Sequence, residues 1–156
     1  YEFLWNIGKV LKRKSIFYSC YKNKIPIFCP ALSDSAIGLM VWNMMLRKKE
    51  PLMNEYKDLA KILEIAWHKK KAVFYVGGGV PKNYIQQAMQ FSSPAIYGVQ
   101  IKVDHESFGG SSGASLKEGI SWGKIHEKGK FVDVICDATI ALPLIYASLL
   151  DKLKSK

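Results

Sequence analysis

The stretch AVFYVGGGVPKNYIQQAMQF, residues 72–91, indicates most directly how this chain folds. Ala72 to Val76 is a short apolar run typical of a buried strand, and it leads directly into Gly77-Gly78-Gly79. Pro81 suits the first turn of a helix, which Tyr84 to Phe91 continues. A strand, a glycine turn and a helix bring backbone close to a phosphate or a sugar. Three glycines also occur in tight corners, and these lack the spacing of the dinucleotide fingerprint.

Apolar periodicity and turn residues predict the elements on either side of this unit. The helix expected around residues 56–69 has a stripe of core residues: Leu59, Ile62, Leu63 and Trp67. The expected helices span residues 3–11, 15–22, 38–45, 56–69, 116–123 and 139–153, and Pro51 interrupts the pattern after the third. The expected strands, besides 72–76, span Ile25–Cys29, Tyr97–Val103 and Val132–Cys136.

Strands that alternate with helices favour an α/β fold with a parallel sheet and helices on both faces. We therefore expect a Rossmann-like arrangement of three layers, of which this chain holds four strands and only part of the full domain. Asp137 follows the last expected strand, at the edge of the sheet where α/β proteins bind ligands, although it could equally cap the following helix.

The segment GGSSGASLKEGISWGKI, residues 109–125, holds the residues best suited to chemistry. Its glycines let the backbone approach a ligand, and successive N–H groups can hold negative groups. Lys124 stands beside Trp122 and Gly123, where partial loss of hydration would make it a candidate amine nucleophile. A solvated surface lysine is the simpler interpretation, since lysines are mostly exposed. Ser115 and Glu118 have the spacing of a capping box, so Glu118 has a structural interpretation too.

Composition narrows the class of protein. The chain of 156 residues is 49% hydrophobic and 23% charged, which is typical of one folded domain rather than a disordered chain. The net charge of +10 comes from scattered lysine runs that flank apolar segments, with no nucleic-acid-binding motif among them. We therefore expect no nucleic-acid partner, and an acidic protein partner stays open.

Cysteine usage and hydropathy bear on the compartment. Cys20, Cys29 and Cys136 are an odd number without the spacing of a metal site, and the last two lie in apolar runs as buried thiols would. A reducing compartment and a cytoplasmic location follow. The apolar run Ala138–Leu150 is too short to span a membrane, so we expect no membrane association. The cysteine spacing gives no reason to expect a metal.

Four ordered blocks resemble the deoxyhypusine synthase family, in its archaeal and bacterial branch. They are CPALSDSAIG (29–38), YVGGGVPKNYIQQ (75–87), SGASLKEGISWGKI (112–125) and VICDATIALPL (134–144). The resemblance covers most of residues 25–150, and against the family the chain is the C-terminal portion of a single NAD-binding domain. It implies that the N-terminal half, with further strands and part of the cofactor site, lies elsewhere, so that the chain alone is inactive.

The resemblance also implies an activity. Family members use NAD to oxidise spermidine, pass its aminobutyl group to a lysine as an imine, and transfer it to a lysine of the hypusine-carrying translation factor. Lys124 matches the imine-forming lysine, and Glu118 and Trp122 would provide a carboxylate and an aromatic face for the cationic amine. The positions that match family residues near NAD are Asp34, Gly77, Gly78, Gly79, Gly109, Ser112 and Asp137. A homotetramer with shared sites is implied as well.

Three positions depart from the eukaryotic pattern at the polyamine site. Asn83 stands in place of a histidine, and Leu39 and Ser111 stand in place of aspartates. Since lost carboxylates weaken attraction for a cation, agmatine, putrescine or a homospermidine-forming reaction are alternatives to spermidine. A non-catalytic NAD-binding partner subunit is the alternative of a different class.

Overall fold

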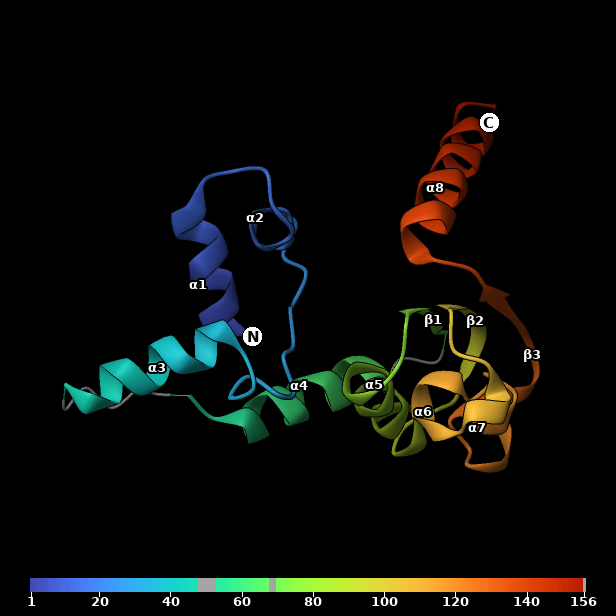
Figure 1. The fold of residues 1–156 in the computed structure, drawn as a ribbon, viewed down its shortest axis with the longest axis horizontal. Coiled ribbons are helices and arrows are strands. Elements are labelled where there is room, and N and C mark those ends of the chain that lie inside the picture. Colours follow the sequence, from blue (N-terminus) through green and yellow to red (C-terminus); the bar gives the residue numbers. More distant parts are fainter. Residues whose placement is uncertain (48–52, 68–69, 156) are drawn as a thin grey trace. The chain divides into compact units, whose positions relative to one another are not determined.

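The computed structural model describes residues 1–47, 53–67 and 70–155. The chain forms two compact units, Tyr1–Ile62 and Leu63–Lys156, which Figure 1 shows in blue to green and in green to red. The helix α4 (Glu55–Ala66) carries the boundary between the two units.

The first unit is helical in its described part. α1 (Glu2–Leu11) packs on α2 (Ile16–Lys22), and α3 (Ala36–Leu46) precedes α4. The contact between α1 and α2 depends on Gly8, because a Cβ at this position would lie 2.3 Å from the carbonyl oxygen of Phe17. Ser15 and Ser35 begin α2 and α3 by accepting a backbone N–H each, which is the usual role of a serine N-cap. The three helices expected in this region are confirmed.

The strand expected at Ile25–Cys29 is wrong. These residues form no regular element and belong to no sheet, and the carbonyl of Ile25 accepts a hydrogen bond of 2.6 Å from the indole of Trp5. A strand needs a neighbour to pair with, and the described part of this unit contains none. The expected break at Pro51 lies outside the described residues.

The second unit is built on a parallel sheet of three strands in the order β1-β2-β3. The strands are β1 (Ala72–Val76), β2 (Ala95–Lys102) and β3 (Ile125–Ile135). α5 (Val80–Gln90) joins β1 to β2, and α8 (Ala138–Lys154) follows β3. Three short helices lie between β2 and β3, namely η1 (Glu106–Phe108), α6 (Gly110–Gly113) and α7 (Glu118–Ser121). The fold is α/β, with helices flanking a parallel sheet, and is part of a Rossmann-like fold.

One face of the sheet is covered by the two connections. The register places Tyr75, Gln100 and Asp133 in one row across the strands on this face. Gly98 lies one row before them, and a Cβ there would come within 3.3 Å of a methyl carbon of Leu116. Because sequential parallel strands are joined by connections of one hand, α5 and the segment with α6 and α7 lie on the same face (Figure 1).

On the opposite face Ile101 is 1% exposed, but several apolar side chains around it are about half exposed. Phe74 and Val76 are 49% and 53% exposed, and Tyr97 and Val132 are 53% and 51% exposed. We expected helices on both faces of the sheet. The connections between the strands, α5 and the segment with α6 and α7, both cover the first face and leave the second without a helix from either connection.

Three element boundaries differ from the sequence prediction. α4 ends at Ala66, so Trp67 no longer follows the buried stripe and is 71% exposed, while residues 68–69 lie outside the described part. α7 is only Glu118–Ser121, and Ser115 does not cap it, since the N-cap position is Lys117 without a side-chain bond. β3 begins at Ile125, before the predicted Val132, because its first half is polar and shows no apolar run.

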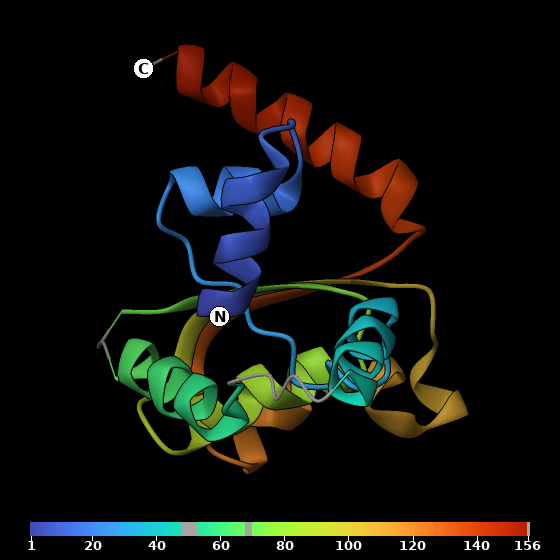
Figure 2. The ribbon, with the colours of Figure 1, turned by 90° about the vertical axis from the view of Figure 1, so that its left-hand side faces the viewer.

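The C-terminal helix leaves the end of β3 as one continuous rod (Figure 2). Asp137 caps it by accepting a hydrogen bond of 2.8 Å from the backbone N–H of Thr139, as the structural alternative for this residue predicted. Pro143 lies inside the helix. Among the described residues, no helix combines the length and the apolar character that crossing a membrane requires.

Candidate functional site

Two glycine segments meet above the carboxyl ends of β1 and β2. The first is the glycine turn, Gly77–Gly79, and the second is the glycine-rich loop, Gly109–Gly113. A Cβ on Gly78 would lie 2.4 Å from the Cα of Ser112, so the two backbones touch where only a hydrogen fits. The sequence residues expected near a cofactor in these two segments are therefore brought together.

The side chain of Gln100, in β2, forms hydrogen bonds with both glycine segments. This side chain is fully buried in the middle row of the sheet. The amide nitrogen donates to the carbonyl of Gly77 at 3.3 Å and to that of Ser112 at 3.2 Å. The amide oxygen accepts from the Nζ of Lys82 at 3.0 Å, so every polar atom of this side chain has a partner.

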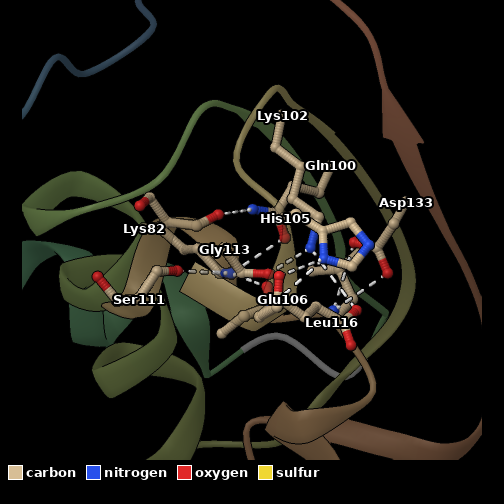
Figure 3. Close-up of polar contacts among 12 residues, drawn as sticks. Lys82, Gln100, Lys102, His105, Glu106, Ser111, Gly113, Leu116 and Asp133 are labelled. Atoms are coloured by element: carbon tan, nitrogen blue, oxygen red, sulfur yellow. Dashed lines mark hydrogen bonds and ion pairs between the residues drawn. The ribbon is translucent and has the colours of Figure 1, made fainter. Parts of the chain in front are cut away.

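Lys82 is the centre of the polar network in Figure 3. It projects from α5, is 3% exposed, and donates to the carbonyls of Ser111 at 3.0 Å and Ala114 at 2.7 Å as well as to Gln100. Its three donors are thus used, and two of them hold the glycine-rich loop and the residue after it.

The electrostatic surroundings of Lys82 tie it to the residues expected to react. Burial lowers the pKa of Lys82, and the charges of Lys102 and Lys124 act in the same direction. The carboxylates of Asp133 and Glu118 act in the opposite direction and raise it. Lys124 and Glu118 therefore contribute to the electrostatic environment of Lys82.

Lys102 is a second buried lysine under the same loop. It ends β2, and its ammonium donates to the carbonyl of Gly113 and lies 3.7 Å from a carboxylate oxygen of Glu106. Figure 3 shows Lys82, Gln100 and Lys102 side by side, pointing toward the segment that contains Ser111 and Gly113. The loop is thus supported by two ammonium groups and one amide.

Asp133 and Tyr75 complete the middle row of the covered face. The carboxylate of Asp133 accepts the backbone N–H of Leu116 at 3.3 Å and 3.4 Å, which fixes the chain between α6 and α7 to β3. Tyr75 is 4% exposed, and burial raises the pKa of its hydroxyl. Within the described part of the chain this hydroxyl has no hydrogen-bond partner.

Lys124 lies between α7 and β3, and its side chain is half-buried. Its backbone N–H donates to the carbonyl of Gly119 at 2.9 Å, and its carbonyl accepts from Ala95 at 3.4 Å. The Nζ lies 5.8 Å from the ring centroid of Trp122, within the range of a cation–π contact. Trp122 itself is 65% exposed, so its ring has a free face.

Several polar residues of the second unit are at its surface, among them the predicted Asn83, Ser111 and Asp137. Asn83 is exposed in the first turn of α5. Ser111 is exposed and contributes its carbonyl, not its hydroxyl, to Lys82. Asp137 accepts both the N–H and the hydroxyl of Thr139, which hold the pKa of its carboxyl below the usual value. His105 is exposed and contacts the Ser107 hydroxyl at 2.9 Å, so its interactions in the described part are local.

Asp34 belongs to the first unit. It is exposed in the turn before α3, where its backbone N–H donates to the carbonyl of Ala31 at 3.1 Å.

The backbone of the two glycine segments has room for a ligand. Gly77, Gly79, Gly109 and Gly110 all have φ between 71° and 76°, which favours glycine. A Cβ on any of these four would meet no atom within 4 Å. Open space beside glycine backbone is what a dinucleotide needs in order to approach the chain closely, so the residues present fit NAD.

A family model for deoxyhypusine synthase matches residues 1–149. The chain belongs to the deoxyhypusine synthase family. It is 44% identical over 154 residues to probable deoxyhypusine synthase 1 of Archaeoglobus fulgidus, covering 97% of this chain and 50% of the relative. It is 39% identical over 159 residues to probable deoxyhypusine synthase of Methanosarcina thermophila, covering 99% of this chain and 50% of the relative. The chain spans about half the length of these curated relatives.

Sequence reasoning missed four residues of this candidate site: Lys82, Gln100, Lys102 and Asp133. A usable signal was present in β2, where Gln100 and Lys102 alternate with apolar residues and must share one face of a strand. For Lys82 and Asp133 the sequence offers no comparable signal, because their burial depends on segments distant in the chain.

Proposed function

We propose that the protein carrying this chain is a deoxyhypusine synthase, a transferase that moves an aminobutyl group from spermidine to a lysine of the hypusine-carrying translation factor. The observation that carries the proposal is the position of Lys124 in a chain of this family. Its ammonium group faces the ring of Trp122 and lies within electrostatic range of the network that joins both glycine segments.

Lys124 would act as the nucleophile. Its Nζ attacks the imine carbon of the oxidised amine, the remainder of the amine leaves as a diamine, and the aminobutyl group stays bound to Lys124 as an imine. The acceptor lysine then attacks the same carbon and releases Lys124 unchanged. The carboxylate of Glu118 and the ring of Trp122 favour binding of the cationic amine beside this nitrogen.

The residues that would hold NAD are Gly77, Gly78, Gly79, Gly109, Ser112 and Asp137, together with Asp34 of the first unit. When bound, NAD would accept a hydride from the amine and return it to reduce the product imine. This chain contributes backbone that is open beside four glycines and a loop that Lys82 and Gln100 hold in place.

The identity of the amine rests on Asn83, Ser111 and Leu39, which stand where eukaryotic relatives have a histidine and two aspartates. Asn83 and Ser111 are both exposed at the site and carry no charge. Spermidine is the proposed substrate by family, with agmatine and putrescine as the amines that the test must distinguish from it.

The assembly is part of the same proposal. Residues 1–156 would form the C-terminal portion of one NAD-binding domain, and activity would require the segment that corresponds to the other half of the relatives. A cytoplasmic homotetramer without nucleic acid is the proposed form. The isolated chain is expected to show no turnover of NAD with polyamine, which a coupled assay of NADH absorbance would check.

Trapping with borohydride tests the role of Lys124. The whole protein is incubated with NAD and labelled spermidine, reduced with borohydride, digested, and analysed by mass spectrometry. An aminobutyl adduct on Lys124 is expected. The variant Lys124→Arg should lose the adduct, whereas Lys128→Arg, which changes an exposed lysine of β3, should keep it.

The other outcomes separate the alternatives. An adduct formed with agmatine or putrescine but not with spermidine would keep the mechanism and change the substrate. An adduct on another lysine would remove Lys124 from the reaction. NAD binding without an adduct from any of these amines would contradict the transferase and favour a non-catalytic partner subunit.

A further inference from the structure

Lys102 is a charged residue in a position where burial is costly. It is the last residue of β2, and its backbone carbonyl accepts the N–H of Cys136 at 3.0 Å, which fixes the strand end against the end of β3. Its side chain is 2% exposed, whereas that of Glu106 is 56% exposed. A buried ammonium destabilises a fold unless acceptors surround it, so the partners of Lys102 explain why this lysine is tolerated.

The two partners of this ammonium lie at opposite ends of one short segment, residues 106–113. Glu106 begins η1 and provides a carboxylate oxygen at 3.7 Å, and Gly113 ends α6 and provides its carbonyl. One charged group thus contacts both the start and the end of the segment that contains the glycine-rich loop. We name this arrangement the Lys102 bridge.

Within this segment, Lys82 and Gln100 hold the carbonyls of Ser111 and Ser112, whereas the tip, residues 108–110, has little support. Phe108 at its tip is 82% exposed, and Gly109 and Gly110 both have positive φ. The backbone hydrogen bonds of the tip within the described residues are local: the N–H of Gly109 donates to the carbonyl of Glu106 at 3.1 Å, and the N–H of Ala114 donates to that of Gly110 at 3.2 Å. An exposed tip with local contacts only is expected to open easily when the start of the segment is released.

The base of the segment is closely packed where the bridge holds it. Gly113 is buried, and a Cβ on it would lie 2.7 Å from the carbonyl oxygen of His105. The end of the loop therefore contacts the residue just before Glu106. The Lys102 bridge therefore joins two ends of the segment that are already in close contact.

We propose that Lys102 is a positioning residue, which holds both ends of residues 106–113 and thereby sets the conformation in which the glycine-rich loop presents its backbone to the nucleotide. The statement about the nucleotide rests on the proposed function. The statement about the loop rests on the contacts alone, so the two can be tested separately.

Hydrogen exchange tests the loop. In the whole protein, Lys102→Met keeps a flexible apolar chain of nearly the same length and removes the ammonium. Peptides that cover residues 106–114 are expected to exchange about tenfold faster in this variant, while those of β1 and α8 stay unchanged. Glu106→Gln removes the carboxylate charge but keeps the hydrogen bond between Lys102 and the carbonyl of Gly113. It should accelerate exchange at the start of the segment by a smaller factor than Lys102→Met does.

Enzyme kinetics test the positioning. We expect Lys102→Met to raise the KM for NAD about tenfold and to change kcat at saturating NAD about twofold or less. Lys102→Arg, which can donate to both partners, should restore much of the affinity and the slow exchange. Lys128→Met serves as the matched control on an exposed lysine of the same unit, with neither property changed.

The outcomes separate this inference from the function. Unchanged exchange over residues 106–114 in both Lys102→Met and Glu106→Gln would overturn the bridge, even if the enzyme proved active with NAD. Fast exchange in Lys102→Met, together with a wild-type protein that binds no NAD, would support the bridge and refute the proposed function. A tenfold fall in kcat at constant KM would overturn the positioning role.

Discussion

At the scale of single residues, Lys82 is the side chain on which the site most depends. Its ammonium satisfies the oxygen of Gln100 and the carbonyls of Ser111 and Ala114. Lys82→Met keeps the approximate volume but leaves the buried oxygen of Gln100 and two partly buried carbonyls without this donor, which should lower the free energy of unfolding by about 3 kcal/mol. Urea denaturation measures this difference, and Lys128→Met is the control for removal of an exposed charge.

The effect of Lys82→Met on stability should also depend on pH. Burial, first of all, and the charge of Lys102 lower the pKa of Lys82 below 10.5, so the folded state loses this proton before the unfolded state does. Between the lowered value and 10.5 the unfolded chain binds more protons, and the contribution of Lys82 to stability therefore rises with pH. The stability difference between wild type and Lys82→Met should widen as pH rises through this window. A difference that narrows would contradict the burial of a charged Lys82.

At the scale of elements, the contact between the glycine turn and the glycine-rich loop can be tested at Gly78. A Cβ there would meet the backbone of Ser112 at 2.4 Å, so Gly78→Ala must displace the loop and should destabilise the fold by about 2 kcal/mol. Hydrogen exchange should also accelerate in residues 109–113.

Gly77→Ala is the matched control for this contact. A Cβ at Gly77 would meet no atom within 4 Å, but the φ of 76° is unfavourable for alanine. The substitution should therefore lower the free energy of unfolding by about 1 kcal/mol through backbone strain and leave hydrogen exchange in the loop unchanged. Equal exchange in the two variants would mean that the turn and the loop are independent.

The elements also show how far sequence reasoning reaches. The unit from Ala72 to Gln90 was predicted nearly to the residue, because the strand, the glycine turn and the helix are each specified by neighbouring residues. The strand at Ile25–Cys29 was wrong because an apolar run cannot show whether a partner strand is present. Ser115 has the spacing of a cap, but the N–H of Glu118 donates to its backbone carbonyl at 3.3 Å and not to its hydroxyl, while Asp133, seventeen positions from Leu116, accepts the N–H of Leu116.

The candidate site divides in the same way. Family motifs identified Lys124, Trp122 and both glycine segments, and the structure places these segments in contact. The side chains that support them could not be predicted, because a lysine on a helix is ordinarily exposed and only the tertiary arrangement buries Lys82.

At the scale of the whole molecule, the two faces of the sheet differ in what covers them. Val73 and Val76 lie on the same strand and are 7% and 53% exposed. Val73→Thr buries a hydroxyl and should lower the free energy of unfolding by about 2 kcal/mol. Val76→Thr should change it little and should reduce self-association of the chain, since it makes the open apolar face more polar.

Denaturation and light scattering on the two variants check this prediction together. The substitution is the same in both, so propensity and size are matched, and the difference reports burial. Equal losses of stability would mean that the face carrying Val76 is covered as well as the other.

The contact of Gly78 with Ser112 has a consequence in time as well as in space. Two backbones separated by no more than a hydrogen cannot move independently through large displacements, so the glycine turn and the glycine-rich loop should respond to a ligand together. After rapid mixing with nucleotide, probes placed in the two segments should report one common relaxation rate. Binding of a ligand would then change the conformation of the segments after β1 and β2 in a single kinetic step.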